Sequence, residues 1–176
     1  MAGEYKGKVF WITGLPGAGK STIGKLLFKK LKNDHPNTVY LDGDVFREIL
    51  GDDRGYDAKD RRKLAMLYGR FCHMLSDQGI NVVCATVSMF HDARNWNREN
   101  ITNYVEIYLK VPIKVLIARD QKQLYSRAMK GEIKNVIGID MEMEEPKYPD
   151  IVFINDESQS LDRIEDALAL ALEKYL

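Results

Sequence analysis

The residues from Gly14 to Ser21 match the pattern G-x-x-x-x-G-K-[ST], and this stretch constrains the fold more than any other part of the chain. A short apolar run, Val9–Thr13, precedes it, and apolar side chains recur at helical spacing from Ser21 to Leu31. Glycines permit backbone conformations that a Cβ would forbid, so such a loop can turn its N–H groups, and the positive end of the following helix, toward bound phosphates. The pattern therefore predicts a strand–loop–helix unit that binds a nucleoside triphosphate.

Side chains within this loop have separate expected roles. Lys20 can reach the outer phosphates, and the Ser21 hydroxyl can bind Mg²⁺. The expected contacts with ATP in this stretch are Gly14, Gly17, Ala18, Gly19, Lys20, Ser21 and Thr22. The alternative is a glycine-rich turn with a solvated lysine, which leaves the flanking strand and helix without explanation. We therefore expect ATP as co-substrate and Mg²⁺ as cofactor.

Strand-like and helix-like segments alternate along the chain. The expected strands are Val9–Thr13, Thr38–Leu41, Ile80–Ala85, Tyr104–Leu109 and Ile151–Ile154. Besides the helix after the phosphate loop, helices are expected near Asp60–Gln78, from about Asp92, at Leu124–Lys130 and at Ser160–Leu176. This alternation predicts an α/β fold with a parallel sheet of about five strands, helices on both faces and ligands at the carboxyl ends of the strands.

The domain organisation is simple. No internal repeat or linker interrupts the 176 residues, so we expect a single domain over residues 1–176. Residues 131–149 combine glycine, proline and mixed charge, which is typical of a mobile loop. We expect a lid over about 119–150, closing over the ligands.

Charge and apolar content exclude several classes of partner. The 26 basic and 26 acidic residues cancel, which argues against a nucleic acid polymer or an anionic membrane. No apolar run approaches the roughly 20 residues needed to span a bilayer, and the start of the chain lacks the apolar core of a signal peptide. Cys72 and Cys84 lie in apolar surroundings without metal-ligand spacing, so we expect reduced core thiols and a cytoplasmic location.

Two carboxylates follow the second expected strand. Asp42 and Asp44 flank a glycine, and Arg47 comes one short turn later. Because ligands of α/β sheets bind at the carboxyl ends of the strands, both carboxylates are expected near the phosphate loop. We expect Asp44 to accept a proton from an attacking hydroxyl and Asp42 to support Mg²⁺ or its waters, with the reverse order left open. Together with Lys20 they are the expected catalytic residues; the alternative is that both merely form a turn and cap the next helix.

Two arginines follow the third expected strand. Arg94 and Arg98 lie four residues apart, so they share one face of a helix. They come just after Ser88–Phe90, near the carboxyl end of the strand, where paired guanidinium groups could clamp an anionic acceptor. The alternative is that they are solvated, as scattered arginines usually are.

Taken together, these segments resemble the adenylyl-sulfate (APS) kinase family from about Lys8 to Asn155. The segments that carry the resemblance are Gly14–Thr22, Leu41–Asp44 with Arg47, Gly55–Tyr56, Asp60–Arg61, Ser88 with Arg94 and Arg98, Arg119–Lys122, Leu124–Tyr125, Gly131–Lys134, Gly138–Asp140 and Glu144–Pro146. The resemblance implies a P-loop kinase fold and transfer of the γ-phosphoryl group of MgATP to the ribose 3′-hydroxyl of a small anionic nucleotide. Since most members form dimers, it also implies a homodimer.

The same resemblance assigns residues to each substrate. It adds Arg119 to the contacts with ATP, and it implies Ser21 and Asp42 as the residues at the metal. The residues that it implies for the acceptor are Arg47, Tyr56, Arg61, Ser88, Phe90, Arg94, Arg98, Lys134, Asn135, Val136 and Ile137.

Several acceptor-side positions depart from the family's pattern. The family's phenylalanine–threonine pair is Val136–Ile137 here, its asparagine after Asp-Gly-Asp is Val45, and an asparagine and two arginines are replaced by Leu64, Met66 and Leu67. The phenylalanine stacks on the acceptor's adenine in the family, so its loss removes one face of an aromatic clamp, worth about 1–3 kcal/mol of stacking. Tyr56 is its expected aromatic partner.

The acceptor therefore stays open between two nucleotides. APS comes first because it is the commonest acceptor of the family. The second is cytidine diphosphoramidate, which relatives of the family in capsular-polysaccharide pathways phosphorylate on the ribose. Outside the family, a small-metabolite kinase and a non-catalytic nucleotide-binding protein are the alternatives; the first would share the loop and fold but lack Gly131–Asp140, and the second would need neither Asp42 nor Asp44.

Overall fold

The computed structural model describes residues 5–51, 55–155 and 161–175, and their strands form one parallel sheet in the order β2–β3–β1–β4–β5. The strands are β1 (Val9–Thr13), β2 (Thr38–Asp42), β3 (Asn81–Ala85), β4 (Tyr104–Lys110) and β5 (Ile151–Ile154). β1 lies at the centre and every one of its residues is buried, which explains its almost continuous apolar sequence. The expected five-stranded parallel sheet is confirmed.

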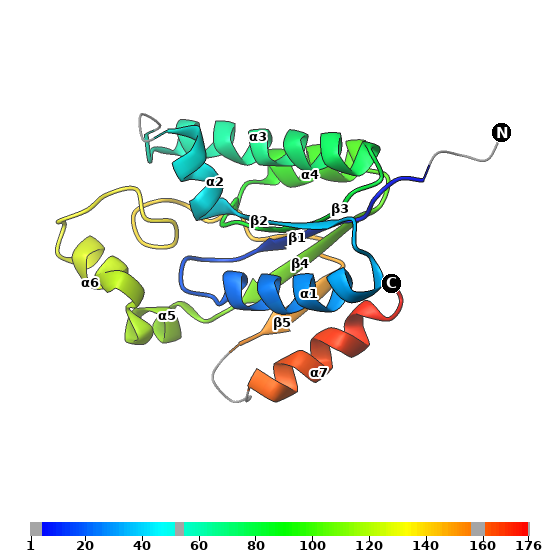
Figure 1. The fold of residues 1–176 in the computed structure, drawn as a ribbon. Helices are drawn as coiled ribbons and strands as arrows, with labels where there is room; N and C mark the ends of the chain where they lie inside the picture. The colour runs from blue at the N-terminus through cyan, green and yellow to red at the C-terminus, as the bar shows by residue number, and fades with distance from the viewer. Residues whose placement is uncertain (1–4, 52–54, 156–160, 176) are drawn as a thin grey trace.

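Helices cover both faces of this sheet (Figure 1). They are α1 (Lys20–Asp34), α2 (Gly43–Leu50), α3 (Ala58–Asp77), α4 (His91–Asn100), α5 (Ile113–Arg119), α6 (Leu124–Met129) and α7 (Leu161–Leu172), with a 3₁₀ turn at Gln121–Gln123. α3 and α4 lie side by side on one face, while α1 and α7 lie on the other. The phosphate loop, α2, α5 and α6 gather at the edge formed by the carboxyl ends of the strands.

The sequence pattern does not predict α2 and α5. Each is short, at eight and seven residues, so a helical period has little room to show. α2 depends on its cap, because the Asp42 carboxylate accepts a hydrogen bond from the Asp44 N–H at 3.0 Å. Most other boundaries differ from expectation by one or two residues, but α7 ends at Leu172, and the expected start of that helix, Ser160, lies outside the described residues.

Alternate residues of β1 pack toward opposite faces of the sheet. Ile12 joins an apolar cluster with Leu27 of α1, whereas Trp11 joins a second cluster with Tyr68 of α3. Both β1 residues have no exposed surface. This two-sided packing fixes β1, and with it the position of the loop that follows.

Cys72 and Cys84 are buried with free thiols, as the sequence predicts. No helix among the described residues has the length and apolar content needed to cross a membrane.

Residues 131–150 connect α6 to β5 and lie beyond the carboxyl ends of the strands (Figure 1). They contain no helix or strand, only an isolated bridge between Ile137 and Met141. Val136 and Ile137 are nevertheless buried in the main apolar cluster. The position fits the expected lid, and its closing over ligands stays a prediction.

Candidate active site

Glycine shapes the phosphate loop. Gly19 has a φ of 95°, in the left-handed region that favours glycine, directly before the first residue of α1. A Cβ on Gly14 would lie 2.6 Å from the carbonyl oxygen of Leu109, so only glycine fits between the loop and β4. The loop therefore ends on the N-terminus of α1, whose unpaired N–H groups favour an anion.

Lys20 is the first residue of α1, and its side chain folds back over the loop. Its Nζ donates to the carbonyl oxygen of Leu15 at 2.8 Å. Burial lowers the pKa of Lys20 from 10.5 to about 8, while attraction by Asp44 and Asp42 opposes that change. The ammonium group is thus held at the loop with two carboxylates close by.

Several donors hold Asp42. The hydroxyls of Ser21 and Tyr40 both donate to its Oδ2, at 2.7 and 2.9 Å, and the N–H of Asp44 donates to its Oδ1. Burial alone would raise the pKa of Asp42, but these hydrogen bonds keep it below its usual value. Asp42 is therefore an oriented carboxylate anion rather than a free base.

Ser21 and Asp42 suit Mg²⁺. Because the Ser21 hydroxyl donates its hydrogen bond to Asp42, the lone pairs of its Oγ remain available to a cation. Mg²⁺ is usually bound by one or two protein side chains together with substrate phosphates and water. The described residues contain no cluster of three or more His, Cys, Asp or Glu side chains able to hold a metal by themselves. The donor set fits Mg²⁺ that binds together with a nucleotide.

Asp44 lies between the phosphate loop and the expected acceptor residues on α3. Burial lowers the pKa of both Lys20, in the phosphate loop, and Arg61, on α3, and the negative charge of Asp44 opposes that lowering at each of them. The residue is exposed, and its carboxylate makes no hydrogen bond with another described residue. An exposed carboxylate beside the phosphate site and a second cationic group can accept a proton from a bound hydroxyl.

Arg47 and Arg61 frame Tyr56 on the other side of Asp44. Their guanidinium carbons lie 3.9 and 5.4 Å from the centre of the tyrosine ring. Arg47 donates to the carbonyl of Gly55 at 2.7 Å, and the Nε of Arg61 donates to the carbonyl of Tyr56 at 2.8 Å. The structure thus brings three of the expected acceptor residues together.

Arg61 also joins this cluster to the segment 131–150. Its Nη2 donates to the carbonyl of Asn135 at 3.0 Å. The carboxylate of Asp140 accepts from the N–H groups of Asn135 and Val136, at 2.8 and 2.6 Å, and so closes a tight loop in which Asn135 has a φ of 65°. Val136 is only 3 % exposed, so this loop presents a buried aliphatic side chain where the family keeps phenylalanine.

Arg94 and Arg98 are engaged elsewhere. They share one face of α4, as predicted, but that face packs on β4, where Glu106 is buried. Arg94 Nε lies 3.4 Å from Glu106 Oε1, and Arg98 Nη2 lies 3.3 Å from Glu106 Oε2 and 3.0 Å from Asp150 Oδ2. Burial raises the pKa of Glu106 and the two arginines oppose that rise. Both arginines are thus paired with carboxylates of the protein itself, Arg94 in the interior and Arg98 at the surface, so we leave both out of the proposed acceptor contacts.

The other expected acceptor residues differ in exposure. Ser88 and Phe90 are buried: the Ser88 hydroxyl hydrogen-bonds that of Thr86 at 2.9 Å, and the guanidinium carbon of Arg62 lies 4.7 Å from the centre of the Phe90 ring. Their side chains pack within the protein. Ile137 is buried beside Val136, and Lys134 is exposed.

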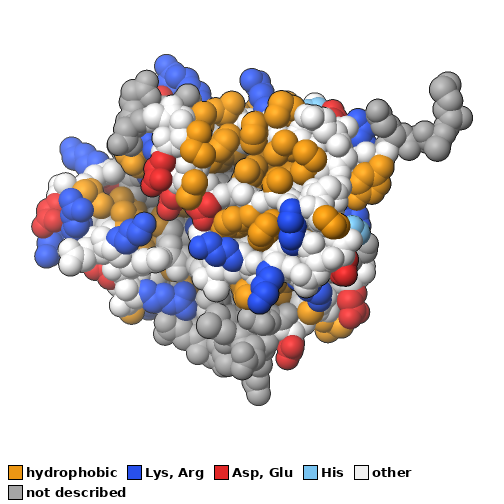
Figure 2. Space-filling model, viewed as in Figure 1, with side chains coloured by type: hydrophobic (Ala, Val, Ile, Leu, Met, Phe, Trp, Pro, Cys, Tyr) orange, Lys and Arg blue, Asp and Glu red, His pale blue; other side chains and the backbone are white. Residues whose placement is uncertain are grey.

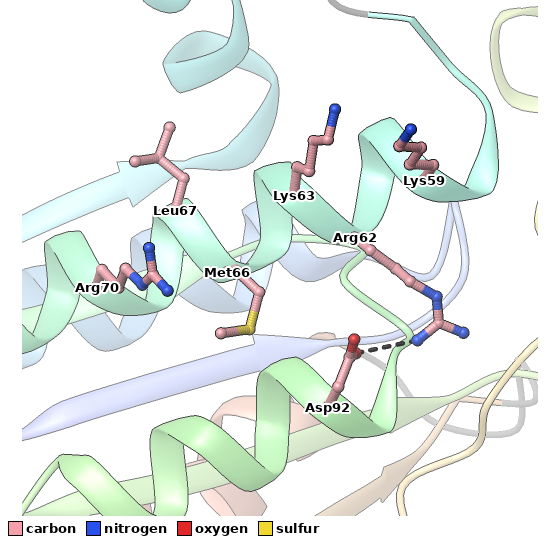
Figure 3. A pocket seen from close by; sticks show the side chains of 7 residues that line it. All are labelled: Lys59, Arg62, Lys63, Met66, Leu67, Arg70 and Asp92. Carbon is pink, nitrogen blue, oxygen red and sulfur yellow. Dashed lines mark hydrogen bonds and ion pairs between the residues drawn. The ribbon is translucent and has the colours of Figure 1, made fainter.

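Glu144 ties the far part of segment 131–150 to α3 and α4. Its carboxylate pairs with Arg62 and accepts from the N–H of His91, and its carbonyl accepts from Arg94 at 2.6 Å. Arg62 also pairs with Asp92 at 3.1 Å (Figure 3). This clasp anchors the segment to the rigid part of the fold.

A hollow of about 740 Å³ lies beside the clasp, between α3 and α4 (Figure 3). It is lined by Lys59, Arg62, Lys63, Met66, Leu67, Arg70 and Asp92. Met66 and Leu67, two of the positions that depart from the family, therefore line a hollow that shares no lining residue with the cluster around Asp44. The third, Leu64, is buried in the apolar cluster of Trp11.

A second cavity adjoins the phosphate loop. It has about 570 Å³ and is lined mainly by apolar side chains of β4, β5 and α7 together with Ala18, Gly19 and Thr22 of the expected ATP contacts. Asn155 lies at its wall and accepts a hydrogen bond from Arg119 at 3.1 Å. The expected ATP residues thus converge on one edge of the sheet.

Sequence reasoning did not assign roles to Tyr40, Asp140 and Glu144. A signal for Tyr40 existed, since residues two apart on a strand point to the same face, and Tyr40 stands two before Asp42. Glu144 pairs with Arg62 across 82 residues, and no local pattern reveals such a partner.

Comparisons with known proteins agree with this geometry. The model of the adenylylsulphate kinase family matches residues 6–154. The chain is 42% identical over 166 residues to a cytidine diphosphoramidate kinase of Campylobacter jejuni, covering 94% of this chain and 95% of that protein. It is 35% identical over 172 residues to an adenylyl-sulfate kinase of Thermodesulfovibrio yellowstonii, covering 97% and 86%. A solved APS kinase of Mycobacterium tuberculosis, in complex with AMPPNP and APS, is 31% identical with a TM-score of 0.85 and covers 97% and 99% of the two chains.

Proposed function

This chain belongs to the adenylylsulphate kinase family, and from that premise we propose that it transfers the γ-phosphoryl group of ATP to the ribose 3′-hydroxyl of cytidine diphosphoramidate. Family membership makes the protein a P-loop phosphotransferase that binds a nucleotide. The choice of acceptor is our own inference. It is carried by one observation: the loop whose Asn135 carbonyl accepts from Arg61, beside Tyr56, has the aliphatic Val136 as its next residue.

The proposed step needs a base, a cation at the phosphates and an oriented acceptor. Asp44 accepts the proton of the 3′-hydroxyl as its oxygen bonds to the γ-phosphorus, and the bond from that phosphorus to the β–γ bridging oxygen breaks to release ADP. Lys20 stabilises the charge on the β- and γ-phosphates. When bound at Ser21 and Asp42, Mg²⁺ would neutralise phosphate charge.

Arg47 and Arg61 are the groups that we propose for the anionic end of the acceptor. Both lie within cation–π distance of Tyr56, on the acceptor side of Asp44. Guanidinium groups bind phosphate oxygens in a planar, two-pronged geometry. Lys134, exposed on the same segment as Val136, can add a further positive charge.

The base of the acceptor is where the two candidate nucleotides differ. An adenine fills the space between two aromatic faces, whereas a smaller pyrimidine fits between Tyr56 and an aliphatic wall. The greater identity to the cytidine diphosphoramidate kinase supports the same choice. We therefore place this nucleotide before APS, which reverses the order drawn from sequence alone.

APS stays the second candidate because several relatives at 35–37% identity are adenylyl-sulfate kinases. A wild-type enzyme that phosphorylates neither nucleotide would contradict the proposed function. The test is to incubate the protein with MgATP and each acceptor, and to identify a ribose phosphomonoester by mass spectrometry and phosphorus NMR. Val136→Phe, which restores the family's aromatic side chain, is expected to move kcat/KM toward APS, and Ile137→Val serves as the matched control in the same loop.

We also propose a homodimer in the cytoplasm. Free buried thiols at Cys72 and Cys84 fit a reducing compartment. For the dimer, the support is an apolar surface over α2, α3 and the edge strand β2 (Figure 2). Val45 and Ile49 on α2 and Met74 on α3 are 53, 73 and 47% exposed, which suits burial against a second copy of the chain.

A further inference from the structure

Tyr40 contacts both residues that we place at the metal. It lies two residues before Asp42 on β2, and its hydroxyl donates to Asp42 Oδ2 at 2.9 Å. The hydroxyl of Ser21 donates to the same oxygen at 2.7 Å. The Tyr40 oxygen also lies 3.5 Å from the carbonyl oxygen of Ser21. One carboxylate oxygen of Asp42 thus accepts two hydrogen bonds, one from the phenol of Tyr40 on β2 and one from the hydroxyl of Ser21 after the phosphate loop.

Close packing fixes the direction of the Tyr40 hydroxyl. A Cβ on Gly24 would lie 2.7 Å from Cε2 of Tyr40, so the ring rests against bare backbone of α1. The Phe28 ring, one turn further along α1, has its centre 6.0 Å from that of Tyr40. Because the ring is already packed on both residues, the hydroxyl loses little freedom when it donates to Asp42.

We propose that Tyr40 is a positioning residue for the magnesium site. Its hydroxyl holds Oδ2 of Asp42 where Ser21 can donate to it, so that the lone pairs of Ser21 Oγ stay directed at the cation. The inference rests on the proposed function, since it takes Ser21 and Asp42 as the residues at the metal. Partners that orient metal ligands in this way typically contribute about 10–100-fold to metal affinity.

The test compares Tyr40→Phe with wild type. This change removes the hydroxyl and keeps the ring that packs on Gly24 and Phe28. The matched control is Tyr5→Phe, which loses a hydroxyl placed 3.4 Å from Asn81, a residue at the start of β3 and so at the opposite end of the sheet. The measurement is the affinity for ADP by titration calorimetry, once with Mg²⁺ and once with EDTA, and the ratio of the two is the enhancement due to the metal.

In EDTA, we expect Tyr40→Phe and wild type to bind ADP with the same affinity. With Mg²⁺, we expect the enhancement of ADP affinity to be about tenfold smaller in Tyr40→Phe than in wild type. Tyr5→Phe is expected to match wild type in both conditions. An unchanged enhancement would overturn the role of Tyr40, as would an equal loss of affinity with and without metal, which indicates a general defect of the loop. A wild-type protein without any enhancement by Mg²⁺ would overturn the proposed metal site itself, so the two failures are distinguishable.

Discussion

Lys20 combines a partly buried position at the phosphate loop with the charge that we propose for binding the phosphates of ATP. Its pKa of about 8 arises because burial outweighs the attraction of Asp44 and Asp42. Below pH 8 the free protein carries the ammonium that phosphate oxygens require. Above it, ATP binding must take up a proton, so the affinity for ATP falls as the pH rises.

We therefore predict that ATP binding weakens from pH 7 to pH 9.5 and is accompanied by proton uptake, measured by calorimetry in buffers of different ionisation enthalpy. Lys20→Arg, whose guanidinium stays charged throughout, should lose this pH dependence. Lys20→Ala should abolish turnover and remain folded. If Lys20→Arg kept the wild-type pH profile, the titrating group would be another residue.

We predict that substitutions of Asp42 and Asp44 impair different steps, metal binding and phosphoryl transfer respectively. Asp44→Asn removes the proposed base and should lower kcat by about 10²–10⁴ while leaving ADP binding with Mg²⁺ near normal. Asp42→Asn removes the acceptor of the Ser21, Tyr40 and α2 hydrogen bonds, so it should lower the enhancement of ADP binding by Mg²⁺. Steady-state kinetics and ADP titrations of both variants are the measurements. Normal turnover by both would rule out the assignment.

The two aspartates and the two arginines differ in how far their positions in the fold could be predicted from the sequence. The position of Asp42 and Asp44 follows from strand and loop order alone, because both come directly after a strand of a parallel sheet. The spacing of Arg94 and Arg98 correctly places them on one helical face. The spacing does not say which way that face of α4 points, and the partner of both arginines, Glu106, stands on β4.

Among the elements, α2 and the segment 131–150 contain residues that we propose for the acceptor side. α2 brings Asp44 and Arg47 to the site, yet it is a short helix that depends on the Asp42 cap. The five strands could be predicted because their apolar runs are long and bounded by breaks. α2 and α5 could not, since their stability comes from capping and packing rather than from a visible period.

The clasp at Glu144 divides the expected lid into two parts. Arg62, His91 and Arg94 hold the chain at Glu144, so we predict that closure is confined to residues 120–140. Hydrogen exchange should slow in that range when nucleotide and acceptor bind together, while residues 142–147 are protected with or without ligands. Glu144→Gln weakens the pair with Arg62 and should extend the exchanging region toward β5. No change in protection on binding would favour a static surface loop.

At the scale of the whole molecule, the unusual feature is the apolar surface over α2, α3 and β2 (Figure 2). We predict that Ile49→Glu converts a dimer into a monomer, because it places a charge in the proposed interface, where Ile49 itself is 73% exposed. Light scattering after size-exclusion chromatography measures the mass. Leu170→Glu, an equally exposed leucine of α7 on the other face of the sheet, is the matched control and should stay dimeric. A wild-type monomer at micromolar concentration would contradict the dimer.

The architecture as a whole follows from alternating strands and helices, but the sequence does not determine the order of the strands or which helix faces meet. Those long-range contacts shape the proposed acceptor side: Arg61 of α3 reaches the carbonyl of Asn135 across 74 residues, and Val136 is the next residue of that loop. The substitution at Val136 is visible in the sequence, whereas the hydrogen bond that holds its loop to Arg61, beside Tyr56, is a property of the folded molecule.

The most direct measurement is a competition in which the protein receives MgATP with equal amounts of cytidine diphosphoramidate and APS. The ratio of the two ribose-phosphorylated products gives the ratio of kcat/KM without any assumption about the protein concentration. We predict a clear excess of the cytidine product, because Val136 and Tyr56 provide one aromatic face rather than two. An excess of the APS product would contradict the proposed acceptor and leave the protein an adenylyl-sulfate kinase with an altered pocket.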